Sequence, residues 1–183
     1  MSNNNETAVF GGGCFWCTEA IYGRLKGVTS VVSGYAGGFL KNPSYHEVSD
    51  GNTGHAEVIQ VTFDPSVITY EELLDVFWHT HDPTTLNKQG ADAGTQYRSI
   101  ILYTTDEQRK KAEESKRNLT KSGEFSSKIV TEIKQLDVFY PAEDYHKDYF
   151  NTHEEQPYCQ LVIAPKLQHF MKKYAARVKQ PAE

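Results

Sequence analysis

The chain has 183 residues and a mass of 20.7 kDa, which fits a single domain over residues 1–183 better than two domains. Its formal net charge is −5 and no dense block of Lys and Arg occurs, so neither a nucleic acid nor a membrane is expected as a partner. Three cysteines are too few for a disulfide framework at this length, and no apolar stretch could span a bilayer, so we expect a cytoplasmic protein with reactive or buried thiols.

The N-terminal third predicts a tail followed by strand, helix and strand. Residues 1–6 are polar and lack the basic and apolar segments of a signal peptide, so we expect a disordered tail. The apolar run 7–10 predicts a strand, and the three glycines after it predict a sharp turn. Apolar residues at three- and four-residue steps over 14–26 predict a helix, and the β-branched stretch 28–35 predicts a second strand.

The middle of the chain contains the clearest strand pattern, over residues 55–63. Thr69 and Glu72 have the spacing of a capping box, which predicts a helix that ends near residue 79. The polar segment 80–96 that follows is a long loop for a compact domain, and loops of this length are often functional.

The last part of the chain repeats the alternation of strands and helices. We expect strands at residues 97–103, 129–136 and 158–163 and helices at residues 105–122, 142–151 and 166–178. This order predicts an α/β (α+β) two-layer sandwich, in which a mixed sheet with a split βαβ, ferredoxin-like core is flanked by helices and long loops.

Cys14 lies between the three glycines and the first expected helix. The unpaired N–H groups and the dipole at a helix N-terminus stabilise an anion, so we expect a thiol with a lowered pKa. A small, inert, buried cysteine is the alternative. The strand–glycine–helix setting favours a nucleophile.

Cys17 completes a Cys-x-x-Cys motif, and three interpretations of this motif stay open: a redox pair, half of a zinc site, or one reactive cysteine with a bystander. A zinc site needs a second pair of ligands, and only Cys159 and scattered histidines remain, so we expect no metal. The bulky Phe15 and Trp16 between the cysteines indicate an apolar wall for a small substrate group.

Glu57 stands near the start of the strand expected at 55–63. It shares a strand face with Ile59, Val61 and Phe63, which allows an inward direction, but the pattern by itself favours an exposed, ion-paired glutamate. A His-x-Glu pair also occurs in zinc deaminases, but there a Pro-Cys-x-x-Cys motif follows it, and here none does.

Several motifs now converge on one family. They are Gly13-Cys14-Phe15-Trp16, Gly34-Tyr35, Pro43-Ser44-Tyr45, Gly54-His55-Ala56-Glu57, Gly94-Thr95-Gln96-Tyr97-Arg98-Ser99 and Ala142-Glu143-Asp144-Tyr145-His146. In this order, over about residues 9–163, the chain closely resembles the A-type peptide methionine sulfoxide reductases. The resemblance implies an enzyme of antioxidant protein repair that reduces the S epimer of methionine sulfoxide, free or in proteins, without a metal or organic cofactor.

The resemblance also implies a role for each matching residue. Cys14 is the nucleophile at sulfur, and Glu57 protonates the oxygen, which a buried carboxyl can do because desolvation raises its pKa. Tyr45 and Tyr97 also match, and their hydroxyls would hold the oxygen. Phe15 and Trp16 would receive the S-methyl group. Asp92 would order the polar network.

The cycle implied by the family ends with a disulfide. Cys14 becomes a sulfenic acid, a second thiol condenses with it, and thioredoxin restores the thiols. Cys159 lies where many members place the resolving thiol, but a thiol in the strand expected there is hard to move to Cys14. Cys17 is the alternative: it is one helical turn from Cys14, and a disulfide between them would require local unwinding of the helix. Two other classes stay open: a general thiol–disulfide oxidoreductase and a non-catalytic module that binds oxidised methionine.

Overall fold

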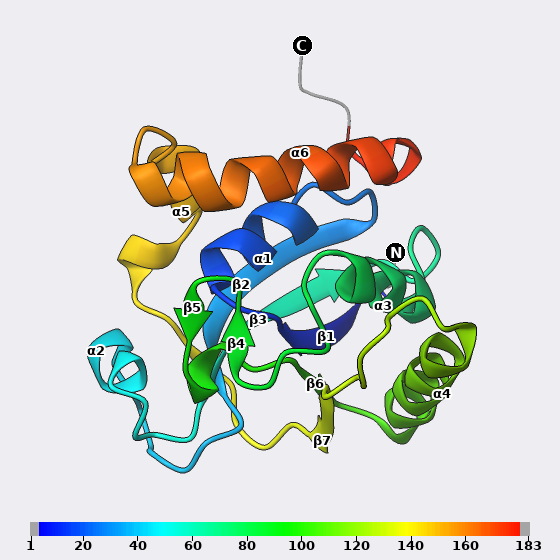
Figure 1. Cartoon of the computed structure of the whole chain (residues 1–183), viewed down its shortest axis with the longest axis horizontal. Coiled ribbons are helices and arrows are strands. Elements are labelled where there is room, and N and C mark those ends of the chain that lie inside the picture. The colour runs from blue at the N-terminus through cyan, green and yellow to red at the C-terminus, as the bar shows by residue number, and fades with distance from the viewer. Residues whose placement is uncertain (1–3, 180–183) are drawn as a thin grey trace.

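The structure is a computed structural model that describes residues 4–179. Its main sheet is mixed and six-stranded, in the order β7-β6-β1-β3-β2-β8 (Figure 1). The strands are β1 (Glu6–Gly11), β2 (Val28–Ala36), β3 (Ala56–Phe63), β6 (Ile100–Tyr103), β7 (Glu132–Gln135) and β8 (Tyr140–Pro141). This class, a mixed sheet flanked by helices, confirms the class predicted from the sequence.

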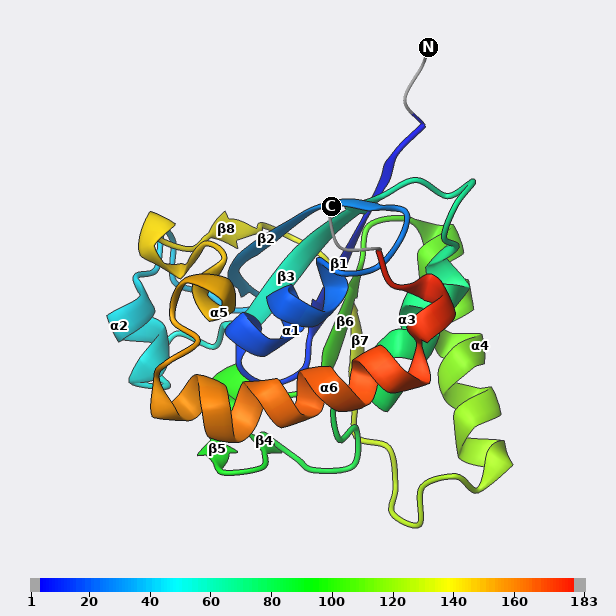
Figure 2. The same ribbon diagram turned by 90° about the horizontal axis from the view of Figure 1, so that it is seen from above.

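Within residues 4–179, six α-helices and a small hairpin surround the sheet. The helices are α1 (Phe15–Tyr22), α2 (Tyr45–Ser49), α3 (Tyr70–His79), α4 (Asp106–Ser122), α5 (Tyr149–Thr152) and α6 (Ala164–Lys173). The hairpin is β4 (Lys88–Gln89) with β5 (Asp92–Ala93). Helix α6 crosses over α1, so α1 lies between α6 and the sheet (Figures 1 and 2). No helix in the described range is long and apolar enough to cross a bilayer.

The four central strands β6-β1-β3-β2 are antiparallel, with α1 connecting β1 to β2 and α3 connecting β3 to β6. This connectivity has the split βαβ pattern, in which β3 inserts between the two strands joined by α1. β7 then adds to β6 in parallel. Because β1 is central, its C-terminal end, where the glycine turn begins, is enclosed by neighbours on both sides.

The main core lies between the sheet and helices α1 and α3. It contains inward residues from every central strand and from both helices, among them Phe10, Ile21, Ile59, Leu73 and Ile101. Six of the eight residues of α1 are buried, since the helix is covered on two sides. The opposite face of the sheet has a smaller core under residues 136 and 139.

Three sequence predictions were wrong in their details. The strand expected at 158–163 is instead a π-helical turn, Cys159–Ile163, that leads into α6. Its buried residues, Cys159 and Ile163, are four apart, which is helical spacing, while Leu161 and Val162 are exposed. A short β-branched run cannot be distinguished from a buried helix by its pattern alone.

The other two differences concern segments near the site. The helix expected at 142–151 is divided into a 3₁₀ turn, Asp144–His146, and the single-turn α5, because Asp148 has a left-handed backbone (φ 53°) between them. The loop expected at 80–96 contains β4, β5 and a 3₁₀ turn, Thr95–Tyr97.

The chain ends and helix caps partly follow the predictions. Of the tail expected over residues 1–6, residues 1–3 lie outside the described range, and Glu6 begins β1 by pairing with Phe63. The Thr69 hydroxyl accepts from the Glu72 amide at the start of α3, as its spacing predicted. Helix α2, which the sequence analysis did not predict, begins with a complete capping box.

The loop after β2 is fastened to the segment that leads into β3. The Gly38 amide donates to His55 Nδ1 (3.0 Å), and the Phe39 amide donates to the Thr53 carbonyl (3.0 Å). A Cβ atom on Gly38 would lie 2.3 Å from the His55 amide nitrogen, so no side chain fits there. This contact positions the start of β3, which carries Glu57.

We expect Gly38→Ala to lower the free energy of unfolding by about 1–3 kcal/mol, the usual cost of overpacking. Gly123→Asn is the matched control, because a Cβ there meets open space and Asn tolerates its left-handed backbone, so about 0.5 kcal/mol or less is expected. Urea unfolding of both variants measures the difference, and equal losses would contradict the tight approach.

Candidate active site

A glycine turn places Cys14 at the start of α1. β1 ends at Gly11, and Gly13 has a left-handed backbone (φ 92°) whose Cβ would approach Gln89 to 3.0 Å. Cys14 is the N-cap with an extended backbone, and its carbonyl accepts from the Cys17 amide (3.1 Å). The side chain of Cys14 is only partly exposed. The thiol therefore stands at the N-terminus of the helix, as predicted.

Glu57 lies directly beside this N-terminus. Its side chain is 2% exposed, and Oε1 accepts a hydrogen bond from the Phe15 amide (3.0 Å). Burial raises the pKa of Glu57 to about 8, and the nearby charge of Asp92 adds to the increase, while the Phe15 hydrogen bond opposes it. The carboxyl points inward, so the exposed position that the strand pattern alone favoured is wrong, and the group is neutral over much of the range near pH 7.

The pKa of the Cys14 thiol is raised, which contradicts the lowered value expected from its position at the helix N-terminus. Burial is the largest cause, followed by the negative charge of Glu57. Hydrogen bonds from the Trp16 amide and the Tyr158 hydroxyl lower the pKa of Cys14, but by less than burial and Glu57 raise it. The sequence pattern reports the helix N-terminus but not the burial that outweighs it.

Three tyrosines surround the thiol and the carboxyl. Tyr45 begins α2, Tyr97 ends the 3₁₀ turn and Tyr158 precedes the π-helical turn. Burial and then the charge of Glu57 raise the pKa of Tyr45 to about 12, and the same two causes raise the pKa of Tyr97. All three hydroxyls therefore stay protonated and can donate hydrogen bonds at neutral pH.

Tyr158 is a site residue that the sequence analysis did not identify. Its hydroxyl donates to Asp92 Oδ2 (2.6 Å), and burial followed by the charge of Cys14 raises its pKa. Asp92 therefore contacts a tyrosine that also contacts the thiol. The only signal in the sequence was the position of Tyr158 next to Cys159, and the strand expected there did not direct it to this site.

The two aromatic residues after Cys14 occupy different positions. Phe15 is fully buried, with its ring centroid 5.0 Å from that of His146 and 6.3 Å from that of Tyr45. Trp16 is partly exposed and stacks on Tyr149, with ring centroids 3.8 Å apart and an interplanar angle of 7°. Trp16 therefore offers a partly exposed surface, whereas Phe15 belongs to the buried core.

His146 and Glu143 support this aromatic wall, and sequence reasoning gave neither of them a role. The Trp16 indole donates to His146 Nδ1 (2.9 Å), so the imidazole is neutral with its proton on Nε2. Glu143 accepts from the Tyr45 amide and the Tyr35 hydroxyl, each at 2.9 Å. Their stretch, residues 142–146, resembled the family, which was the available signal.

The other two cysteines are buried thiols. Cys17 is 4% exposed on α1, and Cys159 is fully buried in the π-helical turn that follows Tyr158. Burial raises the pKa of both. All three cysteines are free.

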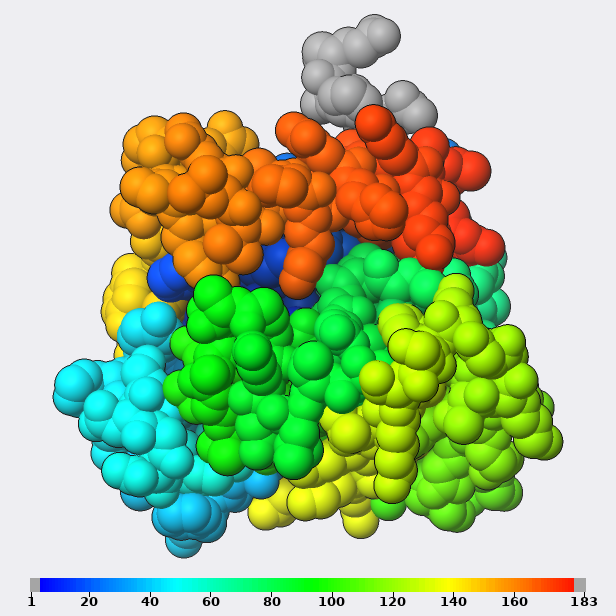
Figure 3. Space-filling view, in the orientation of Figure 1, coloured from blue at the N-terminus to red at the C-terminus, as the bar shows by residue number. Residues whose placement is uncertain are grey.

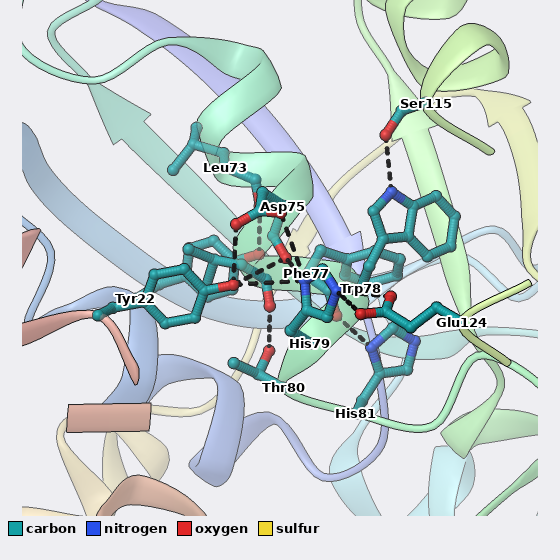
Figure 4. Close-up of polar contacts among 12 residues, drawn as sticks. Tyr22, Leu73, Asp75, Phe77, Trp78, His79, Thr80, His81, Ser115 and Glu124 are labelled. Atoms are coloured by element: carbon teal, nitrogen blue, oxygen red, sulfur yellow. Dashed lines mark hydrogen bonds and ion pairs between the residues drawn. The ribbon is translucent and has the colours of Figure 1, made fainter. Parts of the chain in front are cut away.

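The two histidines near the end of α3 have structural partners. His79 Nδ1 contacts the Asp75 carbonyl oxygen (2.7 Å) and Nε2 contacts Glu124, while His81 Nδ1 contacts the Phe77 carbonyl oxygen (2.5 Å) (Figure 4). Over residues 4–179 no group of three or more His, Cys, Asp and Glu side chains could hold a metal ion.

The surface is hollowed between α6 and the green segment that contains β4 and β5, and blue atoms of the N-terminal part of the chain form the floor of this hollow (Figure 3).

The residues described above bring together a thiol, a neutral carboxyl, tyrosine hydroxyls and an aromatic surface. Such a set can attack an electrophilic atom, protonate its leaving oxygen and enclose a small apolar group.

Comparisons with known proteins agree with this chemistry. Residues 6–179 match the family model described as peptide methionine sulfoxide reductase. The chain is 58% identical over 174 residues to the peptide methionine sulfoxide reductase MsrA of Saccharolobus solfataricus. The aligned residues cover 95% of this chain and 97% of that protein.

Solved structures give the same result. Reduced Mxr1 from Saccharomyces cerevisiae superposes with a TM-score of 0.77 at 36% identity, covering 85% of this chain and 89% of the yeast chain. Mxr1 in complex with Trx2 superposes with a TM-score of 0.55 at 29% identity, covering 79% of this chain and 84% of the yeast chain.

We expect Glu57→Gln to make the Cys14 thiol easier to ionise. Above about pH 8 the Glu57 carboxylate is negative and raises the pKa of Cys14, and the neutral amide removes that charge. The pH at which iodoacetamide alkylation of Cys14 reaches half its maximal rate should therefore fall, as followed by mass spectrometry. Cys14→Ser is the control for site specificity, and an unchanged or higher midpoint in Glu57→Gln would contradict this electrostatic coupling.

Proposed function

The chain belongs to the peptide methionine sulfoxide reductase family and is an oxidoreductase of that type, and from this premise we propose how its own residues reduce methionine sulfoxide to methionine. One observation carries the proposal: the Phe15 amide holds the Glu57 carboxyl at 3.0 Å, beside the residue that bears the nucleophile. A neutral acid and a thiol then act on the same S=O group.

The proposed reaction transfers the sulfoxide oxygen to Cys14. Cys14 attacks the sulfur, Glu57 protonates the oxygen, and the proton of the thiol replaces the one that Glu57 gives up. An S–S bond forms between Cys14 and the substrate sulfur as the substrate S–O bond breaks. The oxygen, released as hydroxide, then bonds to Cys14 Sγ and the S–S bond breaks with its electrons on the methionine sulfur, so that a thiol and a sulfoxide become a sulfenic acid and methionine. A raised thiol pKa is compatible with this scheme, because the substrate oxygen takes up a proton as the thiol loses one.

The tyrosine hydroxyls are proposed to hold the oxygen during this step. The charges of Glu57 and Cys14 both raise the pKa values of Tyr45 and Tyr97, which supports a position of the two hydroxyls between Glu57 and Cys14. Donors already oriented at the place where charge develops stabilise the transition state. Asp92 would act indirectly, by orienting Tyr158 through their 2.6 Å hydrogen bond.

The S-methyl group is proposed to lie on Trp16. The indole is fixed by His146 and by stacking on Tyr149, so its face is already in place before the substrate binds. Phe15 is fully buried and would support this wall rather than form its whole surface. A fixed apolar wall on one side of sulfur and oxygen donors on the other would select one epimer, which the family resemblance implies is S.

We propose Cys17 as the resolving thiol. Cys14 is the N-cap, outside the regular helix, so the unwinding expected from the sequence is not required. Residues three apart at a helix start have Cα atoms about 5–6 Å apart, within the disulfide range. The Cys159 thiol is fully buried in a helical turn, so it would have to move first.

The proposed reductant is a thioredoxin. The similar yeast protein Mxr1 forms a complex with Trx2, which supports a protein dithiol as the source of electrons. Three free thiols fit a reducing compartment such as the cytoplasm, where oxidised methionine, free or in proteins, would be the substrate.

We expect dithiothreitol-driven turnover of one sulfoxide epimer of a blocked methionine and none by Cys14→Ser. Glu57→Gln should reduce the rate about 100-fold or more, since it removes the proton donor. Glu19→Gln is the matched control, because Glu19 is a partly buried acid on α1 whose pKa is also raised, to about 7. Reduction of insulin disulfides without reduction of sulfoxide would contradict the proposal, and so would binding of sulfoxide without turnover.

Stoichiometric sulfoxide without reductant should produce a disulfide between Cys14 and Cys17. Peptide mapping after thiol blocking identifies the pair, and Cys17→Ser should instead accumulate a sulfenic acid that dimedone traps. Cys159→Ser is the control and should form the same disulfide as the unmodified chain. A bond between Cys14 and Cys159 would overturn this assignment.

A further inference from the structure

A groove with a cavity volume of about 630 Å³ lies between α4 and β7, and we call it the β7 groove. Four cationic side chains line it, Lys116, Arg117, Lys121 and Lys134, against two acids, Glu113 and Glu132. This balance is opposite to that of the whole chain, whose net charge is −5. The β7 groove therefore attracts negative charge on a protein that otherwise repels it.

The two acids in the β7 groove are already engaged. Glu132 pairs with Lys134 of the groove (3.4 Å) and with Arg98 outside it (3.6 Å), and Glu113 pairs with Arg109 (3.7 Å), so both acids have cation partners and Lys134 is engaged as well. Among residues 4–179, neither Arg117 nor Lys121 forms an ion pair. Their charges are available to a partner.

The strand beside these cations ends the sheet. The Glu132 amide donates to Ser99 (3.0 Å) and the Leu136 amide donates to Tyr103 (2.9 Å), so these residues face β6. Because backbone direction alternates along a strand, Ile133 and Gln135 direct their N–H and C=O groups away from the sheet. An extended peptide can pair with such an edge.

The β7 groove is on the same end of the sheet as the thiol. Gly11 pairs with Ile100, and Ile100 pairs with Glu132, so two strand spacings of about 5 Å each separate Gly11 from β7. Cys14 follows Gly11 by three residues. A polypeptide paired with β7 can therefore reach the thiol through a spacer on the order of five to eight residues, because each extended residue spans up to about 3.3–3.6 Å.

We propose that the β7 groove binds an extended, acidic segment of an oxidised polypeptide while a methionine sulfoxide of the same polypeptide enters the site at Cys14. This inference rests on the proposed function and names a substrate class for it. Pairing with β7 supplies affinity for any extended chain, and the cations select for Asp and Glu. If Lys134 instead serves to block edge pairing, as edge lysines often do, no peptide binds.

The kinetic test compares two peptides that carry one methionine sulfoxide, a short spacer, and a tail alternating Val with either Glu or Lys. The tail with Glu should give a KM about fivefold to tenfold lower in low salt, the effect of two surface ion pairs, with kcat unchanged. Arg117→Glu/Lys121→Glu should abolish this difference and leave turnover of blocked methionine sulfoxide unchanged. Lys172→Glu/Lys173→Glu, on α6, is the charge-matched control and should keep the difference.

A binding test that needs no turnover separates this proposal from the proposed function. The acidic peptide with unoxidised methionine should slow hydrogen exchange at the amides of Ile133 and Gln135, and the Lys-tailed peptide at the same concentration should slow it less. The proposal requires both protection and the KM difference. Equal KM values for the two tails, or an unprotected β7, would overturn it even if sulfoxide reduction is normal.

Discussion

One hydrogen bond, from the Phe15 amide to the Glu57 carboxyl, connects the two parts of the site. It joins the first turn of α1 to the middle of the sheet and fixes the acid beside Cys14. The bond satisfies one of the free N–H groups at the helix N-terminus, a role usually taken by the capping side chain. Loss of this contact would free the carboxyl from the position on which the proposed proton transfer depends.

The same burial that keeps Glu57 protonated also disfavours the Cys14 thiolate. The two groups are coupled, because the charge of the Glu57 carboxylate raises the pKa of the Cys14 thiol. A site of this kind holds both protons until a substrate offers a new acceptor. The proposed mechanism uses this property, since the sulfoxide oxygen accepts a proton in the step in which sulfur is attacked.

The sequence predicted the sheet and the position of Cys14 at a helix N-terminus, because strand alternation and the glycine turn are local patterns. The pairing of Cys14 with Glu57 was implied by the resemblance to the family. It did not predict Tyr158, whose position depends on a π-helical turn in a short β-branched run that also fits a strand. The contact between Trp16 and His146 joins residues 130 positions apart, and no local pattern reports such a distance. The raised thiol pKa likewise depends on burial by distant segments.

The central claim is that an uncharged Glu57, rather than a preformed thiolate, sets the pH range of the first chemical step. The most direct measurement is the rate of methionine formation in a single turnover, without reductant, from pH 6 to pH 10. We predict a rate that falls as pH rises through about 8, where Glu57 loses its proton, and no such fall in Glu57→Gln. A rate that instead rises through this range, as thiolate accumulates, would contradict it.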